Sequence, residues 1–148
     1  MRIQFVATRK NPDPSERELY ELDLMLKILG FSRAFMDLGL QTVASVTPRH
    51  HQISFADEYL APIDYDTDPD IIALSGKTSC ITRTYQVADE FRRRGKFVVL
   101  GGIHASLRNE EALQHADVVV DGEAEEIWLD VLDDLEKKKP KQLYKADG

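Results

Sequence analysis

The chain has 148 residues, of which 19 are Lys or Arg and 26 are Asp or Glu, so its net charge is −7. This length fits one domain whose core needs no disulfide or metal for stability. A single cysteine, Cys80, excludes an internal disulfide and favours a reducing, cytoplasmic location. The acidic balance argues against a nucleic-acid partner. No apolar run reaches the roughly 18–20 residues of a membrane span, so no span is expected.

The first part of the chain predicts two strands separated by two helices. Residues 3–7 form a short apolar run that is typical of a buried strand. Residues 15–30 carry a capping-box spacing and an apolar face, which predicts a helix. Residues 31–46 predict a second helix, although Gly39 within it costs about 1 kcal/mol unless something packs closely there. The alternation in residues 50–58 predicts a weaker, partly exposed strand.

The second part alternates apolar runs with amphipathic stretches. Strands that are apolar on both faces and alternate with helices indicate a parallel sheet covered on both sides. We expect an α/β, Rossmann-like (flavodoxin-like) doubly wound fold with five parallel strands in the order 2-1-3-4-5. Three of the strands are the runs at residues 70–75, 97–100 and 118–120, and the helices are expected at residues 81–94, from residue 109, and at residues 123–138.

Glycines cluster where these apolar runs end. In an open parallel sheet, ligands bind beyond the carboxyl ends of the strands. Glycine at such an end permits a sharp turn and lets a ligand approach the backbone, although a glycine can also simply end a strand. Three glycine-bearing ends on one edge favour a ligand cleft: Gly76, the pair Gly101-Gly102, and Gly122. His104 follows the pair and either lines this cleft or stabilises its loop.

Two familiar phosphate chemistries are not supported. Gly76-Lys77-Thr78 follows a strand and precedes a helix, but a phosphate loop needs a further glycine five residues earlier, where the chain has Ile71. A phosphorylatable receiver domain needs clustered carboxylates at its strand ends to hold magnesium, and here the first and third predicted strands end in Thr8 and Ser75.

The remaining aromatic and histidine residues predict structural roles. The four histidines show no metal-ligand spacing among themselves, and His50 and His51 are expected at the surface before a strand. His115 lies near a helix end, where a positive ring is favoured. Trp128 lies on the apolar stripe of the last helix and is expected in the core.

The stretch from residue 70 to residue 132 resembles the N-terminal cobalamin-binding domain of cobalamin-dependent radical SAM enzymes. It is most similar to proteins of the anaerobic magnesium-protoporphyrin IX monomethyl ester cyclase type. The first 60 residues match only weakly. The main matching blocks are D-I-I-A-L-S-G-K-T (70–78), V-V-L-G-G-I-H-A-S-L (98–107) and G-E-A-E-E-I-W (122–128).

This resemblance implies a module that holds cobalamin against the carboxyl edge of its sheet. It implies contacts with the nucleotide tail from Ser75, Gly76 and Thr78. Contacts around the corrin would come from Gly101, Gly102, His104, Gly122 and Glu123. The D-x-H-x-x-G motif that places a histidine on cobalt in other cobalamin proteins is absent, so no protein histidine is expected on the metal. No catalytic residue is expected in this chain.

The resemblance also implies a larger parent protein. Enzymes of this group bind S-adenosyl-L-methionine and a [4Fe-4S] cluster in a following domain with C-x-x-x-C-x-x-C, which this chain lacks. Residues 1–136 are therefore expected to form the cobalamin-binding domain, and residues 137–148 a basic tail or the start of a linker. The parent would be an oxidative cyclase or a methyltransferase. The alternatives are a docking module that has lost the cofactor and a small self-sufficient enzyme, which the missing nucleophile–base and acid pairs weaken.

Overall fold

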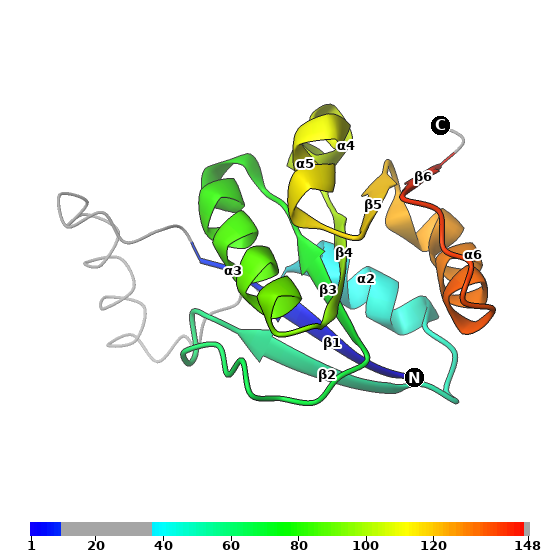
Figure 1. Cartoon of the computed structure of the whole chain (residues 1–148), viewed down its shortest axis with the longest axis horizontal. Helices are drawn as coiled ribbons and strands as arrows, with labels where there is room; N and C mark the ends of the chain where they lie inside the picture. The colour runs from blue at the N-terminus through cyan, green and yellow to red at the C-terminus, as the bar shows by residue number, and fades with distance from the viewer. Residues whose placement is uncertain (10–36, 147–148) are drawn as a thin grey trace, which may run out of the picture.

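A computed structural model describes residues 1–9 and 37–146 (Figure 1). The helix expected at residues 15–30 and the first part of the helix expected at residues 31–46 lie outside these residues. The described elements form one sheet of six parallel strands in the order β2-β1-β3-β4-β5-β6. The strands are β1 (Arg2–Ala7), β2 (Gln52–Asp57), β3 (Ile71–Ser75), β4 (Phe97–Gly101), β5 (Val118–Asp121) and β6 (Leu143–Lys145).

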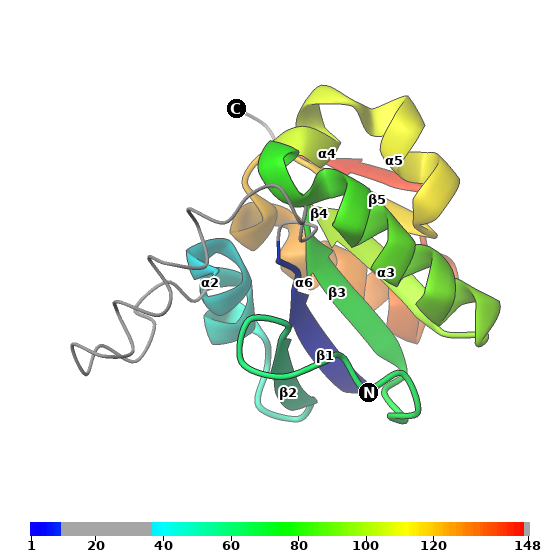
Figure 2. The same ribbon diagram turned by 90° about the vertical axis from the view of Figure 1, so that its left-hand side faces the viewer.

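Helices cover both faces of the sheet, as expected for a doubly wound fold (Figures 1 and 2). On one face, Phe5, Ala73 and Val120 pack with Trp128 under α2 (Leu38–Val46) and α6 (Ala124–Glu136). On the other face, alternate strand residues such as Ile72, Leu74 and Leu100 pack under the remaining helices. The helices are α2 (Leu38–Val46), α3 (Ile81–Arg93), α4 (Ile103–Leu107), α5 (Asn109–His115) and α6 (Ala124–Glu136), and a short 3₁₀ turn, η1 (Thr78–Cys80), precedes α3.

The predicted strand count of five is wrong, because β6 adds a sixth strand beside β5. It lies within residues 137–148, the segment for which the sequence predicts a basic tail or the start of a linker. β6 pairs with β5, and Tyr144 lies opposite Val120 in this pair. The buried Tyr144 ring packs in the core under α6. The hydroxyl of Tyr144 donates a hydrogen bond to Asp134 of α6 (2.9 Å). A strand of three residues is too short to show a periodic pattern in the sequence. The order of the other five strands is as predicted.

His51 is not at the surface, so that prediction is also wrong. Its side chain is 1% exposed, whereas the side chain of His50 is 65% exposed as expected. Burial, and then the neighbouring His50, lowers the pKa of His51. In the described part of the chain, no helix is long and apolar enough to cross a membrane.

Candidate functional site

The site lies at the carboxyl edge of the sheet, where the parallel strands all end. Ser75 ends β3 and lies opposite Gly101 at the end of β4, while Asp121 ends β5 beside them. Because each of these strands ends at the same edge, the loops that follow them are brought together. The sequence spacing predicted this convergence, and the register confirms it.

An apolar cavity of about 120 Å³ opens between this edge and helices α2 and α6. Among the candidate residues from the sequence, five line it, and Gly76, Thr78 and His104 do not. The residues that line the opposite wall of the cavity were not predicted, because no pattern in the sequence shows which helix packs over the glycine loops. The five candidate residues are Ser75, Gly101, Gly102, Gly122 and Glu123, and the missed walls include Phe5, Gly39, Leu40, Val43 and Trp128.

The missing side chain of Gly101 keeps part of this cavity open. A Cβ added to Gly101 would lie 3.6 Å from Cβ of Val120, which is an ordinary contact, and the backbone has no positive φ there. The fold therefore does not require glycine at this position. Gly39 of α2 lines the same cavity, and its added Cβ would meet only Oδ1 of Asp37 at 3.3 Å. Together these two glycines leave room for a flat group between the sheet and α2.

Gly102 has a different, structural role. Its φ of +94° is accessible chiefly to glycine, and an added Cβ would lie 2.9 Å from the backbone nitrogen of Gly76. The two loops interlock here: the N–H of Gly76 donates to the carbonyl of Gly101 (2.7 Å), and the N–H of His104 donates to the carbonyl of Gly76 (2.9 Å). Gly76 and Gly102 thus hold the β3 and β4 loops against each other, next to the cavity.

His104 points away from the cavity, toward α3 and α5. Its Nδ1 lies 3.3 Å from the hydroxyl of Thr78, and its Nε2 lies 3.5 Å from a carboxylate oxygen of Glu111. This Nε2 is buried and not aligned for a hydrogen bond, so the Glu111 contact is only an ion pair when the ring is protonated. The ring of Tyr85 packs nearly perpendicular to the same imidazole, with 6.4 Å between the ring centroids. The side chains of His104 and Thr78 therefore join the β4 loop to the turn that precedes α3.

The charge around the cavity disfavours an anionic ligand inside it. Glu123 and Glu125 line the cavity at the start of α6, and Glu123 makes no capping hydrogen bond to that helix. Carboxylates at this position would repel a phosphate that the helix N-terminus could otherwise bind. The hydroxyl of Ser75 offers a neutral hydrogen-bonding partner in the lining. The cavity thus suits a flat, apolar and uncharged group.

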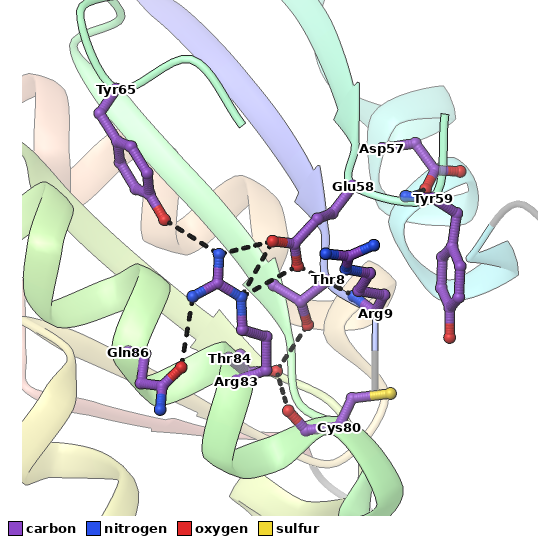
Figure 3. Close-up of polar contacts among 10 residues, drawn as sticks. All are labelled: Thr8, Arg9, Asp57, Glu58, Tyr59, Tyr65, Cys80, Arg83, Thr84 and Gln86. Carbon is purple, nitrogen blue, oxygen red and sulfur yellow. Dashed lines mark hydrogen bonds and ion pairs between the residues drawn. The ribbon is translucent and has the colours of Figure 1, made fainter. Parts of the chain in front are cut away.

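A second polar cluster, around Glu58, ties β1, β2 and α3 together at the same edge (Figure 3). Glu58 directly follows β2, and its side chain is only 5% exposed. Its carboxylate accepts hydrogen bonds from Nε and Nη2 of Arg83 and from the backbone N–H of Arg9 (3.2 Å). Nearby, the buried hydroxyls of Thr8 and Thr84 are 2.7 Å apart. The cluster fixes where the chain leaves β1, and no local signal in the sequence pairs Glu58 with a residue 25 positions away.

Comparison with known proteins identifies the family to which this chain belongs. Residues 25–132 match the family model described as B12 binding domain. The chain is 44% identical over 108 residues to bacteriochlorophyllide d C-8(2)-methyltransferase of Chlorobaculum tepidum, covering 72% of this chain and 24% of that protein. It is 31% identical to bacteriochlorophyllide d C-12(1)-methyltransferase of the same organism, covering 76% and 25%.

A third relative comes from a different organism. The uncharacterized methyltransferase PH0819 of Pyrococcus horikoshii is 30% identical over 113 residues, covering 68% of this chain and 25% of that protein. The chain thus spans about a quarter of the length of the curated relatives that it matches. The family model covers well over half of the chain and confirms the resemblance to a cobalamin-binding domain. This protein belongs to the B12-binding domain family.

Proposed function

We propose that this chain is the cobalamin-binding module of a larger methyltransferase of the radical SAM type. The observation that carries the proposal is the cavity that Gly39 and Gly101 leave open at the carboxyl edge of the sheet. Its volume of about 120 Å³ is below the roughly 300–1,000 Å³ of sites that enclose a whole drug-sized ligand. The cavity would therefore hold one flat, uncharged ring of the cofactor, such as the base of the nucleotide tail, and the strand-end loops around it would face the rest.

The residues of this edge fit such a cofactor by shape and by polarity. The hydroxyl of Ser75 can bond an amide side chain of the corrin, whereas the carbonyls of Gly101 and Gly102 and the N–H of Gly122 are already hydrogen-bonded within the protein. Phe5 and Trp128 give the inner wall an aromatic, apolar surface. When bound, cobalamin supplies a cobalt centre that can carry a methyl group. Gly76, Thr78 and His104 contribute by holding the two loops in place.

None of the four histidines of the chain lines the cavity. His50 and His51 precede β2 at the opposite edge of the sheet. His104 points toward α3 and α5, and His115 is paired with Asp89 of α3 (3.0 Å) and stacked on Tyr85. We therefore infer that this chain provides no histidine ligand to cobalt.

The chemistry itself belongs to other parts of the parent protein. The relatives carry the name methyltransferase, and this favours methyl transfer over oxidative cyclisation. Their length, about four times the matched region, supports further domains in the parent. The blocks that this chain shares with radical SAM enzymes support a following domain that binds S-adenosyl-L-methionine and a [4Fe-4S] cluster. A cytoplasmic location fits such a cluster.

The first test is retention of the cofactor by the purified chain. After mixing with hydroxocobalamin and desalting, the protein fraction is expected to keep the visible absorption of about one corrin per chain, because the edge is already formed. The spectrum is recorded under aerobic and anaerobic conditions. If no corrin absorption is retained under either condition, the alternative of a docking module that has lost the cofactor is favoured instead.

A further inference from the structure

Three side chains of the kinds that bind metal ions lie close together at the amino ends of the strands, opposite to the end where the cavity lies. His50 and His51 lie in the turn between α2 and β2, and Glu136 is the last residue of α6. One nitrogen of each imidazole and one carboxylate oxygen all lie within 4.8 Å of one another. The two histidines are adjacent in the sequence, but Glu136 is 85 positions away from His51, so no sequence spacing could indicate this group.

The distances suit a small cation. Nε2 of His50 lies 3.3 Å from Oε1 of Glu136, and Nε2 of His51 lies 3.5 Å from the same oxygen. Zinc binds imidazole nitrogen and carboxylate oxygen at about 2.0–2.2 Å, so neighbouring ligands of a tetrahedral zinc ion are about 3.3–3.5 Å apart. Two of the three ligand pairs already have this separation. The third pair is no more than 4.8 Å apart, and the exposed side chains of His50 and Glu136 have room to adjust around an ion.

The ligands are carried by parts of the fold that are fixed relative to one another. Nε1 of the buried Trp128 in α6 donates a hydrogen bond to Oγ1 of Thr47 (2.9 Å), at the start of the turn. The backbone N–H of His51 donates to the carbonyl of Pro48 (3.0 Å), which closes the turn. The His51 side chain is almost completely buried. The two backbone segments and the His51 ring are therefore fixed before an ion binds, and only the exposed side chains of His50 and Glu136 lose conformational freedom.

From this arrangement we propose that His50, His51 and Glu136 bind one zinc-class divalent transition-metal ion. Imidazole together with carboxylate suits zinc and its neighbours better than magnesium or calcium, which prefer oxygen ligands alone. Three protein ligands leave one coordination position for water. The site lies at the opposite end of the strands from the carboxyl edge, and none of its three ligands lines the cavity.

The charged groups around the three ligands bear on this proposal in opposite ways. The Glu136 carboxylate supplies the one negative charge of the site. The amino nitrogen of Met1 lies 3.2 Å from Nδ1 of His51, on the far side of the ring from Glu136. The positive charge of the Met1 ammonium group opposes the binding of a cation at this site. When an ion binds to Nε2 of His51, Nδ1 carries the ring hydrogen and must act as the donor in its contact with the Met1 nitrogen. Lys137, next in the chain, is bonded to Asp133 instead and stays away from the ligands.

The test is a zinc titration of the full 148-residue chain without a histidine tag, followed by calorimetry. Wild type is expected to bind one Zn²⁺ per chain. His50→Ala and Glu136→Gln remove one ligand each from half-exposed or exposed positions, and each is expected to weaken binding at least about tenfold. His115→Ala is the matched control, because this histidine also pairs with a carboxylate but lies on the other face of the sheet.

Cobalt(II) gives a second readout that reports coordination directly. The wild-type chain with one equivalent of Co²⁺ is expected to develop the strong visible absorption of a four-coordinate ion, and both ligand variants to lose it. The proposal is overturned if wild type shows no saturable zinc binding. It is equally overturned if His50→Ala and Glu136→Gln bind zinc as tightly as wild type and His115→Ala do.

Discussion

Gly102→Ala is expected to lower the free energy of unfolding by roughly 3 kcal/mol. The residue has φ +94° and ψ 169°, a region that side chains rarely adopt. An added Cβ would also lie 2.9 Å from the backbone nitrogen of Gly76 and 3.1 Å from its carbonyl oxygen. Backbone atoms cannot move aside as a flexible side chain can, so the interlocked β3 and β4 loops must separate. Urea denaturation followed by far-ultraviolet circular dichroism measures the change.

Gly101→Ala is the matched control for this prediction. The neighbouring glycine has no positive φ, and its added Cβ meets only Val120 at an ordinary distance of 3.6 Å. Its free energy of unfolding is expected to stay within about 1 kcal/mol of wild type. Equal destabilisation by the two substitutions would contradict the separate roles assigned to the two glycines.

Glu58→Gln is expected to lower the free energy of unfolding by about 2–3 kcal/mol. The Arg83 guanidinium, whose side chain is 25% exposed, would keep its charge without the carboxylate that now accepts two of its N–H groups. The amide has only one accepting oxygen, so Arg9 and Arg83 could not both be satisfied. The same urea experiment measures the loss.

Asp133→Asn serves as the control for Glu58→Gln. It removes the carboxylate of a pair with Lys137 in which both side chains are more than half exposed. Exposed ion pairs contribute little to stability, so the unfolding curve should be nearly unchanged. If the two variants have the same effect, the Glu58 cluster does not hold β1, β2 and α3 together.

The central strands and their order were predictable because their signal is local and strong. Residues 97–100 and 118–120 are continuous apolar runs, and such runs in alternation with helices leave few arrangements of a parallel sheet. β6 was not predictable, because three residues next to a lysine-rich segment acquire their role only by pairing with β5. His51 was misplaced for the same reason: its burial comes from the packing of the α2–β2 turn against the end of α6.

The candidate site was predictable in part. Glycines after the apolar runs indicated the carboxyl edge, and five of the eight candidate residues line its cavity. In the sequence, Gly101 and Gly102 look like one glycine pair. Their φ angles and neighbouring atoms show two different roles: Gly101 leaves space in the cavity, and Gly102 permits the turn after β4. The walls from α2 and the Glu58 cluster depend on contacts between distant segments, which no motif in the sequence encodes.

We propose that cobalamin occupies the space that Gly101 leaves open. The most direct measurement compares the dissociation constant for hydroxocobalamin of wild type, Gly101→Ala and Gly101→Val, each first shown to be folded. The affinity is predicted to fall stepwise with side-chain size, at least about tenfold for valine, which corresponds to about 1.4 kcal/mol. Folded Gly101 variants that bind hydroxocobalamin as tightly as wild type would contradict the claim.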